Sequence, residues 1–349
     1  MTEGLLSRPP KEGARLLALS YLDQAAAAWP RVHDPEDSEA LHDFRVALRR
    51  LRSTLRSYRE WLEKSLPKKL LKRLRRLAQS TGPGRDAEVQ IEWLRARSRH
   101  LSSYHRAGLN WLLARLEERM RAAYGEMEAE LAQEFEKVEE DLRRRLSVFK
   151  TEVHLDGSPH KVTLGHVTAK ILRDEVAALE KHLARIAGPD DVEEAHEARI
   201  QAKRLRYLLE PLAGEIPGAP PLVKRFKAFQ DLLGELHDAH VLETELVQAV
   251  ETAAALRARL LLDLSLAGTE DERALRAAGR RANESGLIAL ARLNRARRDR
   301  LFGEIQDGWI DGKADAFLRE VEALGEGMAL LNTPDSASAP HPPPAPPPS

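Results

Sequence analysis

A histidine followed by evenly spaced cations occurs twice in this chain. The first copy is His42–Arg52 (HDFRVALRRLR) and the second, 154 positions later, is His196–Arg206 (HEARIQAKRLR). In each copy cations stand 3, 7, 8 and 10 positions after the histidine. On an α-helix the histidine and the cations at 3, 7 and 10 fall within a sector of about 80°. Because like charges crowded on one face repel one another, we expect a polyanion to bind this face.

The first basic segment also has an apolar face, formed by Phe44, Leu48, Leu51, Leu55 and Leu62. With His42 at 0°, this face centres near about 200° and the cation stripe, which Arg56 extends, near about 310°. The cations therefore border the buried side, which predicts that they line a groove between helices. Further cations follow each copy. After the first copy, Lys69, Lys72, Arg73 and Arg76 stand at helical spacing, and after the second come Lys224, Arg225 and Lys227.

Charge is unevenly distributed in a chain that is neutral overall, with 55 Lys plus Arg and 55 Asp plus Glu. Residues 42–76 hold 13 cations and 3 acids, whereas residues 126–141 hold 8 acids and one Lys. The basic faces could therefore simply be solvated, or could pair with this acidic stretch without any ligand. That alternative stays open beside polyanion binding.

The composition narrows the class of polyanion. Aromatic residues make up only 5% of the chain, and those in the basic segments fall at largely core-facing positions. Base stacking on an aromatic platform is therefore not expected. The sequence also has no helix-turn-helix, zinc-finger or RNP motif, so we do not expect sequence-specific binding of nucleic acid. A phosphate-rich anion without bases fits best.

His42 and His196 could donate hydrogen bonds to phosphate when protonated. A second hypothesis is phosphotransfer, because His-Asp/Glu-x-Arg also occurs in the phosphoacceptor helix of two-component kinases. Two other motifs are incomplete: His237-Asp238 lacks the further ligands of a metal-dependent phosphohydrolase, and residues 308–314 are one residue short of a P-loop. We therefore expect no catalytic residue, no metal site and no cofactor.

The predicted fold class is all-α, because Leu, Ala, Arg and Glu dominate and β-branched alternation is nearly absent. We expect helices over about 13–29, 34–64, 67–82, 85–100, 103–149 and 163–186. The order of features repeats at offsets of 152 to 154, Gly82 matching Gly234 and Arg85-Asp86 matching His237-Asp238. This predicts an internal duplication, with repeats at 1–154 and 155–331, and a disordered Pro-rich tail at 332–349. In that alignment Asp86 and Asp238 read as helix-start or cation-orienting residues.

The chain has no cysteine and therefore no thiolate or disulfide chemistry. Neither a signal-peptide run nor a membrane-spanning stretch is apparent, so we expect a cytoplasmic protein that does not contact membranes.

The two basic helices, each followed by a Lys/Arg-rich segment and a Gly-x-x-Arg/His-Asp turn, resemble the CHAD domain, the conserved histidine α-helical domain. The likeness covers about Gly13 to Leu330. It implies two helical bundles, related by pseudo-twofold symmetry, around a basic central cavity. It further implies binding of inorganic polyphosphate and association with polyphosphate granules. The chain departs from the family at Lys203, where Arg is commoner, and at His237, where the first copy has Arg85. The triphosphate-tunnel enzyme domain sometimes fused to this family is not apparent, so we expect no enzymatic activity.

Carried onto this chain, the resemblance and the basic faces together predict one set of polyphosphate-binding residues. It comprises His42, Arg45, Arg49, Arg52, Arg56, Lys69, Lys72, Arg73, Arg76, His196, Arg199, Lys203, Arg206, Lys224, Arg225 and Lys227.

Overall fold

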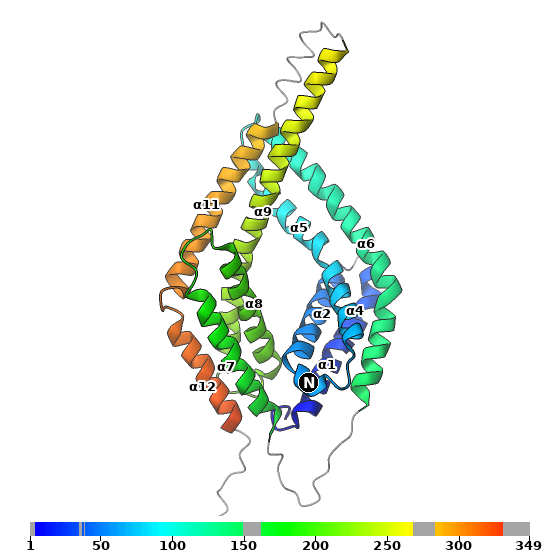
Figure 1. The fold of residues 1–349 in the computed structure, drawn as a ribbon, viewed down its shortest axis with the longest axis vertical. Helices are drawn as coiled ribbons and strands as arrows, with labels where there is room; N and C mark the ends of the chain where they lie inside the picture. Colours follow the sequence, from blue (N-terminus) through cyan, green and yellow to red (C-terminus); the bar gives the residue numbers. More distant parts are fainter. Residues whose placement is uncertain (1–3, 35–36, 38, 149–161, 268–282, 331–349) are drawn as a thin grey trace, which may run out of the picture.

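The computed structural model describes residues 4–34, 37, 39–148, 162–267 and 283–330, and every regular element in these ranges is a helix (Figure 1). The all-α prediction is therefore confirmed. The repeat boundary at residue 154 and the Pro-rich tail lie outside the described residues, so the division into repeats stays a prediction. No described helix combines the length and apolarity needed to cross a bilayer.

Four helices of the N-terminal half pack together: α1 (Pro10–Ala28), α2 (Ala40–Ser57), α4 (Lys68–Ser80) and α6 (Arg106–Ser147). A short 3₁₀ helix (Trp29–His33) follows α1. The helix expected to reach residue 64 is interrupted at Tyr58, after which α3 (Arg59–Leu62) begins. The Tyr58 ring is buried, and its hydroxyl shares a 2.8 Å hydrogen bond with the Thr168 hydroxyl. This bond joins the two halves at the end of α2.

The C-terminal half contains α7 (Leu164–Leu183), α8 (Val192–Leu209), η3 (Glu210–Leu212), α9 (Ala219–Leu266) and α12 (Asp315–Leu330), with α11 (Asn283–Trp309) between α9 and α12. The Thr163 hydroxyl caps α7 by accepting from the backbone N–H of His166. Before α8, a carboxylate oxygen of Asp191 accepts from the backbone N–H groups of Ala187 and Gly188. This turn fixes where α8, and with it the second basic motif, begins.

The long helices α6 and α9 extend beyond these bundles (Figure 1). Their far portions join α5 (Gly82–Arg97) and α11 around a second apolar cluster that includes Ile91, Leu112, Leu246 and Leu290. The 3₁₀ helix η2 (Ser98–His100) follows α5. Gly108 of α6 and Gly286 of α11 let these two helices cross closely. A Cβ atom on Gly108 would lie 2.3 Å from the carbonyl oxygen of Asn283.

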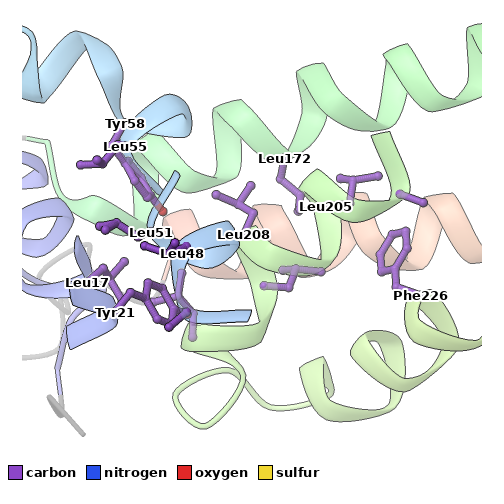
Figure 2. Packing of buried hydrophobic residues seen from close by; sticks show 14 of the residues in the cluster. Leu17, Tyr21, Leu48, Leu51, Leu55, Tyr58, Leu172, Leu205, Leu208 and Phe226 are labelled. Carbon is purple, nitrogen blue, oxygen red and sulfur yellow. The ribbon is translucent and has the colours of Figure 1, made fainter. Parts of the chain in front are cut away.

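The larger core runs through both halves (Figure 2). In it Leu17 of α1 and Leu48 of α2 lie on one side, and Leu205 of α8 and Phe226 of α9 on the other. The apolar face predicted for the first motif is confirmed, because none of its five residues is more than 3% exposed. Burial of this face fixes the rotation of α2, and the rotation in turn fixes where its cations point.

One predicted repeat feature is wrong. The turn expected at Gly234 does not form, because α9 runs unbroken through it, so Asp238 lies mid-helix and is no helix-start residue. In the first half the chain does break, at Thr81, between α4 and α5. There Gly84 packs so closely that an added Cβ would lie 2.5 Å from the Tyr124 ring.

Candidate functional site

Helices α2 and α8 pack against each other, and this contact brings the two basic motifs together. Arg49 of α2 is close enough to lower the pKa of two α8 cations, Arg199 and Lys203, although burial is the larger cause for both. Two segments 154 positions apart in the sequence thus share one electrostatic site.

A pocket of about 880 Å³, which we call the motif pocket, is built around this contact. Its lining is dominated by cations from four helices. The basic lining residues are His42, Arg45, Arg49 and Arg50 from α2, Arg85 from α5, Arg199, Lys203 and Arg206 from α8, and Lys224 and Lys227 from α9. Its acidic lining residues are fewer: Glu210, Asp231, Glu235 and Asp238. The pocket is therefore electropositive as a whole.

Several cations of the motif pocket, Lys224 among them, have no ion-pair partner among the described residues. Within the described residues, no carboxylate lies within 4 Å of a charged nitrogen of Arg45, Arg49, Arg199 or Lys203. Burial, and then the charge of Arg49, lowers the pKa of Arg45. For Lys203, burial and then the charges of Arg199, Arg49 and Arg206 lower the pKa to about 7. These shifts mean that burial and neighbouring charges make the charged forms of Arg45 and Lys203 costly in free energy.

His196 stacks on His237 of α9, with ring centroids 4.9 Å apart. Burial, followed by repulsion from Arg199, lowers the pKa of both imidazoles, that of His237 to about 4. The Nδ1 atom of each ring is buried without a hydrogen-bond partner among the described residues. His42, by contrast, is exposed at the pocket lining. The two motif histidines therefore have different surroundings.

Asp86 of α5 and Asp238 of α9 both act electrostatically on Arg199. Both raise the pKa of Arg199, against the larger effect of burial, which lowers it. Burial raises the pKa of Asp238 itself, and Arg297 and then Arg199 oppose that shift. The cation-orienting interpretation of the two aspartates is compatible with these positions.

Arg52 and Arg56 line a different pocket, of about 730 Å³, which we call the α4 pocket. It is bounded by α2, α3, α4, α8 and the segment before α4. Arg49 and Lys203 line both pockets. The cations of α2 are thus divided between two pockets, which the single stripe in the sequence did not indicate.

The remaining predicted cations lie outside both pockets. Lys69 and Lys72 are exposed on α4 and line neither one. Arg73 pairs with Glu134 at 3.0 Å and with Asp141 at 3.5 Å, Arg76 pairs with Glu130, and Arg225 pairs with Glu320 at 2.8 Å. The acidic stretch at 126–141 therefore neutralises part of α4, as the alternative interpretation proposed. It does not reach Arg45, Arg49, Arg199 or Lys203, which form no ion pair among the described residues.

Sequence reasoning missed several lining residues of these pockets. Arg75 and Arg204 line the α4 pocket, whereas Arg50 and Arg85 line the motif pocket. Arg85 and His237 carried a signal, because they occupy matching positions in the two halves. His240, which lies close to His237-Asp238 in the sequence, is buried with Nε2 hydrogen-bonded to the Pro189 carbonyl oxygen at 2.9 Å. It holds the turn before α8.

Comparison with known proteins now settles the family. A protein-family model for the CHAD domain matches residues 17–247. The chain belongs to the CHAD domain family. Among solved structures, this CHAD protein is similar to the CHAD domain from the plant Ricinus communis, with 21% identity, a TM-score of 0.53 and coverage of 90% of this chain and 92% of that one. It is also similar to PptA from Streptomyces chartreusis, with 18% identity, a TM-score of 0.51 and coverage of 84% and 99%.

At these identities the two structures show a shared fold. No curated protein matches the chain. The resemblance stated from the paired motifs is therefore confirmed at the level of the family and of its all-helical fold.

Proposed function

We propose that this CHAD protein binds inorganic polyphosphate in the motif pocket. The observation that carries the proposal is the meeting of Arg45, Arg49, Arg199 and Lys203, from two distant segments, without a carboxylate partner among the described residues. A phosphate chain would supply negative charge to all four of these cations. Arg can bind phosphate oxygens in a bidentate manner, which makes such contacts strong and oriented.

The lining also supports the choice of ligand. Polyphosphate has neither bases nor apolar groups. Among the described residues, the lining of the motif pocket has no Phe, Tyr or Trp, and its apolar side chains are limited to Val46, Pro220 and Val223. We further propose that the two halves arose by internal duplication around a basic cavity, because α1–α2 and α7–α8 present the motif in the same order. Location in the cytoplasm at polyphosphate granules is an extension of the same proposal.

We propose binding without catalysis. His196 and His237 do not line the motif pocket, and they are stacked on each other with pKa values that burial lowers, so we assign binding to the cations and no chemistry to these two rings. Phosphotransfer through His42 or His196 is the competing function, and it would leave a covalent mark. Incubation with a phosphodonor followed by detection of phosphohistidine would replace our proposal with that one.

The decisive experiment compares affinity for long-chain polyphosphate with that for duplex DNA of equal charge. For polyphosphate we expect tighter binding and a log affinity that falls linearly with log salt, by analogy with nucleic acids. The Arg45→Ala/Arg199→Ala variant should bind more weakly, with a slope shallower by about 0.7–0.9 for each lost contact.

The matched control is Arg73→Ala/Arg225→Ala, which removes the same charge from outside both pockets. It should keep the wild-type affinity for polyphosphate. Equal weakening in the two double variants would mean that net charge alone governs binding, and would overturn the proposed site.

A further inference from the structure

The α4 pocket differs from the motif pocket in its walls. Leu66, Leu71 and Leu74 line it from the α4 side, and Leu55 and Ile200 from α2 and α8. Leu55, Leu66 and Leu74 belong to the larger core and are at most 4% exposed, so the core reaches the pocket here. An apolar wall offers nothing to a bare phosphate chain, which would lose hydration against it.

The same pocket contains a cluster of unneutralised cations. Burial lowers the pKa of Arg52, and the next causes are the charges of Arg75 and Arg56. Within the described residues none of these three arginines forms an ion pair, and the one acidic lining residue, Glu63, lies 3.8 Å from Arg59. Three neighbouring arginines that no carboxylate neutralises can bind an anion.

Tyr207 is a second, independent sign of a ligand. It lines the α4 pocket and is only 8% exposed, yet its hydroxyl has no hydrogen-bond partner among the described residues. A buried hydroxyl without a partner costs free energy that a ligand oxygen could recover. The pocket volume of about 730 Å³ lies in the range usual for sites that enclose small molecules.

We propose that the α4 pocket binds an amphipathic organic phosphate. Its phosphate head contacts Arg52 and Arg75, and its apolar body lies against Leu71 and Leu74. The two pockets share Arg49 and Lys203, but the residues assigned to the phosphate head, Arg52 and Arg75, do not line the motif pocket of the proposed polyphosphate function. The two proposals can therefore fail separately.

The test measures binding of butyl, hexyl and octyl phosphate by calorimetry, below their aggregation concentrations, on the full chain. Each methylene buried against the leucine wall should tighten binding by about fourfold. Inorganic phosphate carries the charge without the alkyl chain, and octyl glucoside carries the chain without the charge. Both should bind far more weakly than octyl phosphate. Equal binding of inorganic phosphate and octyl phosphate would overturn the proposal.

Variants then assign the site. Arg52→Ala/Arg75→Ala should abolish octyl phosphate binding, and Leu71→Ser should flatten the dependence on chain length. Lys69→Ala/Lys72→Ala removes the same charge from the exposed side of α4 and should bind like wild type. Retained binding in Arg52→Ala/Arg75→Ala, with helicity intact by circular dichroism, would place the ligand elsewhere. In Arg45→Ala/Arg199→Ala, octyl phosphate binding should persist whether or not polyphosphate binding is lost.

Discussion

Lys203 should couple proton uptake to anion binding. Burial and the charges of Arg199, Arg49 and Arg206 lower its pKa to about 7, while the charge of Asp238 opposes the shift only weakly. At pH 8.5 the free protein therefore holds Lys203 mostly as the neutral amine. A phosphate chain in the motif pocket favours the charged form and moves the pKa back toward its ordinary value of about 10.4.

The sign of the pH dependence follows from this shift. Binding above pH 7 requires a proton, so affinity for polyphosphate should fall by up to about tenfold per pH unit from pH 7 upward. The free protein should show the opposite trend in stability. Because the pKa of Lys203 is lower in the folded than in the unfolded chain, unfolding takes up a proton above pH 7. The melting temperature of the free protein should therefore rise as pH increases from 7 toward 10.

Calorimetry in buffers of different ionisation enthalpy counts the protons directly. We expect about one proton taken up per binding event at pH 8.5 in the wild type. Lys203→Arg, whose side chain stays charged, should take up none and bind with an affinity that does not change from pH 7 to 9. His196 and His237 do not explain uptake at pH 8.5, because their pKa values are lowered below the ordinary value. Undiminished proton uptake in Lys203→Arg would refute the reasoning.

Three further outcomes are expected. By NMR, the His237 imidazole should titrate near pH 4 in the free protein, because burial and then Arg199 lower its pKa, and polyphosphate should raise that midpoint; a midpoint near 6.5 would contradict the burial. Arg73→Ala should lower the free energy of unfolding by about 0.2–1 kcal/mol, measured by urea unfolding, because it loses its ion pairs with α6, and should leave polyphosphate affinity unchanged. Gly108→Ala should destabilise the chain by about 1–3 kcal/mol, because backbone atoms of α11 occupy the position of the new Cβ; the gain in helix propensity is only about 1 kcal/mol, so a stabilised variant would disprove the close crossing.

Local periodicity explains what could be predicted from the sequence. Burial of the Phe44 face required only the 3.6-residue helical repeat, because a single apolar stripe decides how α2 rotates toward the core. The neighbouring placement of the α2 cations then followed from the same rotation. The pairing of the two motifs was suggested by their repetition, and the packing of α2 on α8 brings it about.

Tertiary contacts decided the rest. Arg73 and Arg76 look like members of the basic set in the sequence, and only the position of α6 shows that acidic residues cover them. Arg45 lines the motif pocket and Arg52 the α4 pocket, and this difference likewise depends on how α8 packs against α2. Gly82 and Gly234 occupy matching positions, but Gly82 is followed by Pro83 and Gly84, whereas Gly234 stands alone. A single glycine costs a helix about 1 kcal/mol, which the packing of α9 overcomes.

Lys203 occupies the α8 motif position that Arg49 occupies in the α2 motif. In a pocket where Arg49, Arg199 and Arg206 already repel one another, a fourth arginine could not lose its charge. A lysine can release its proton, which lowers the repulsion in the free protein. It can take the proton up again, and so regain its charge, when an anion binds. Because Lys203 and Arg49 line both pockets, an anion in either pocket acts on the same amine. Compared with an arginine, Lys203 should thus make the free protein more stable above pH 7, and it should make anion affinity dependent on pH in the same range.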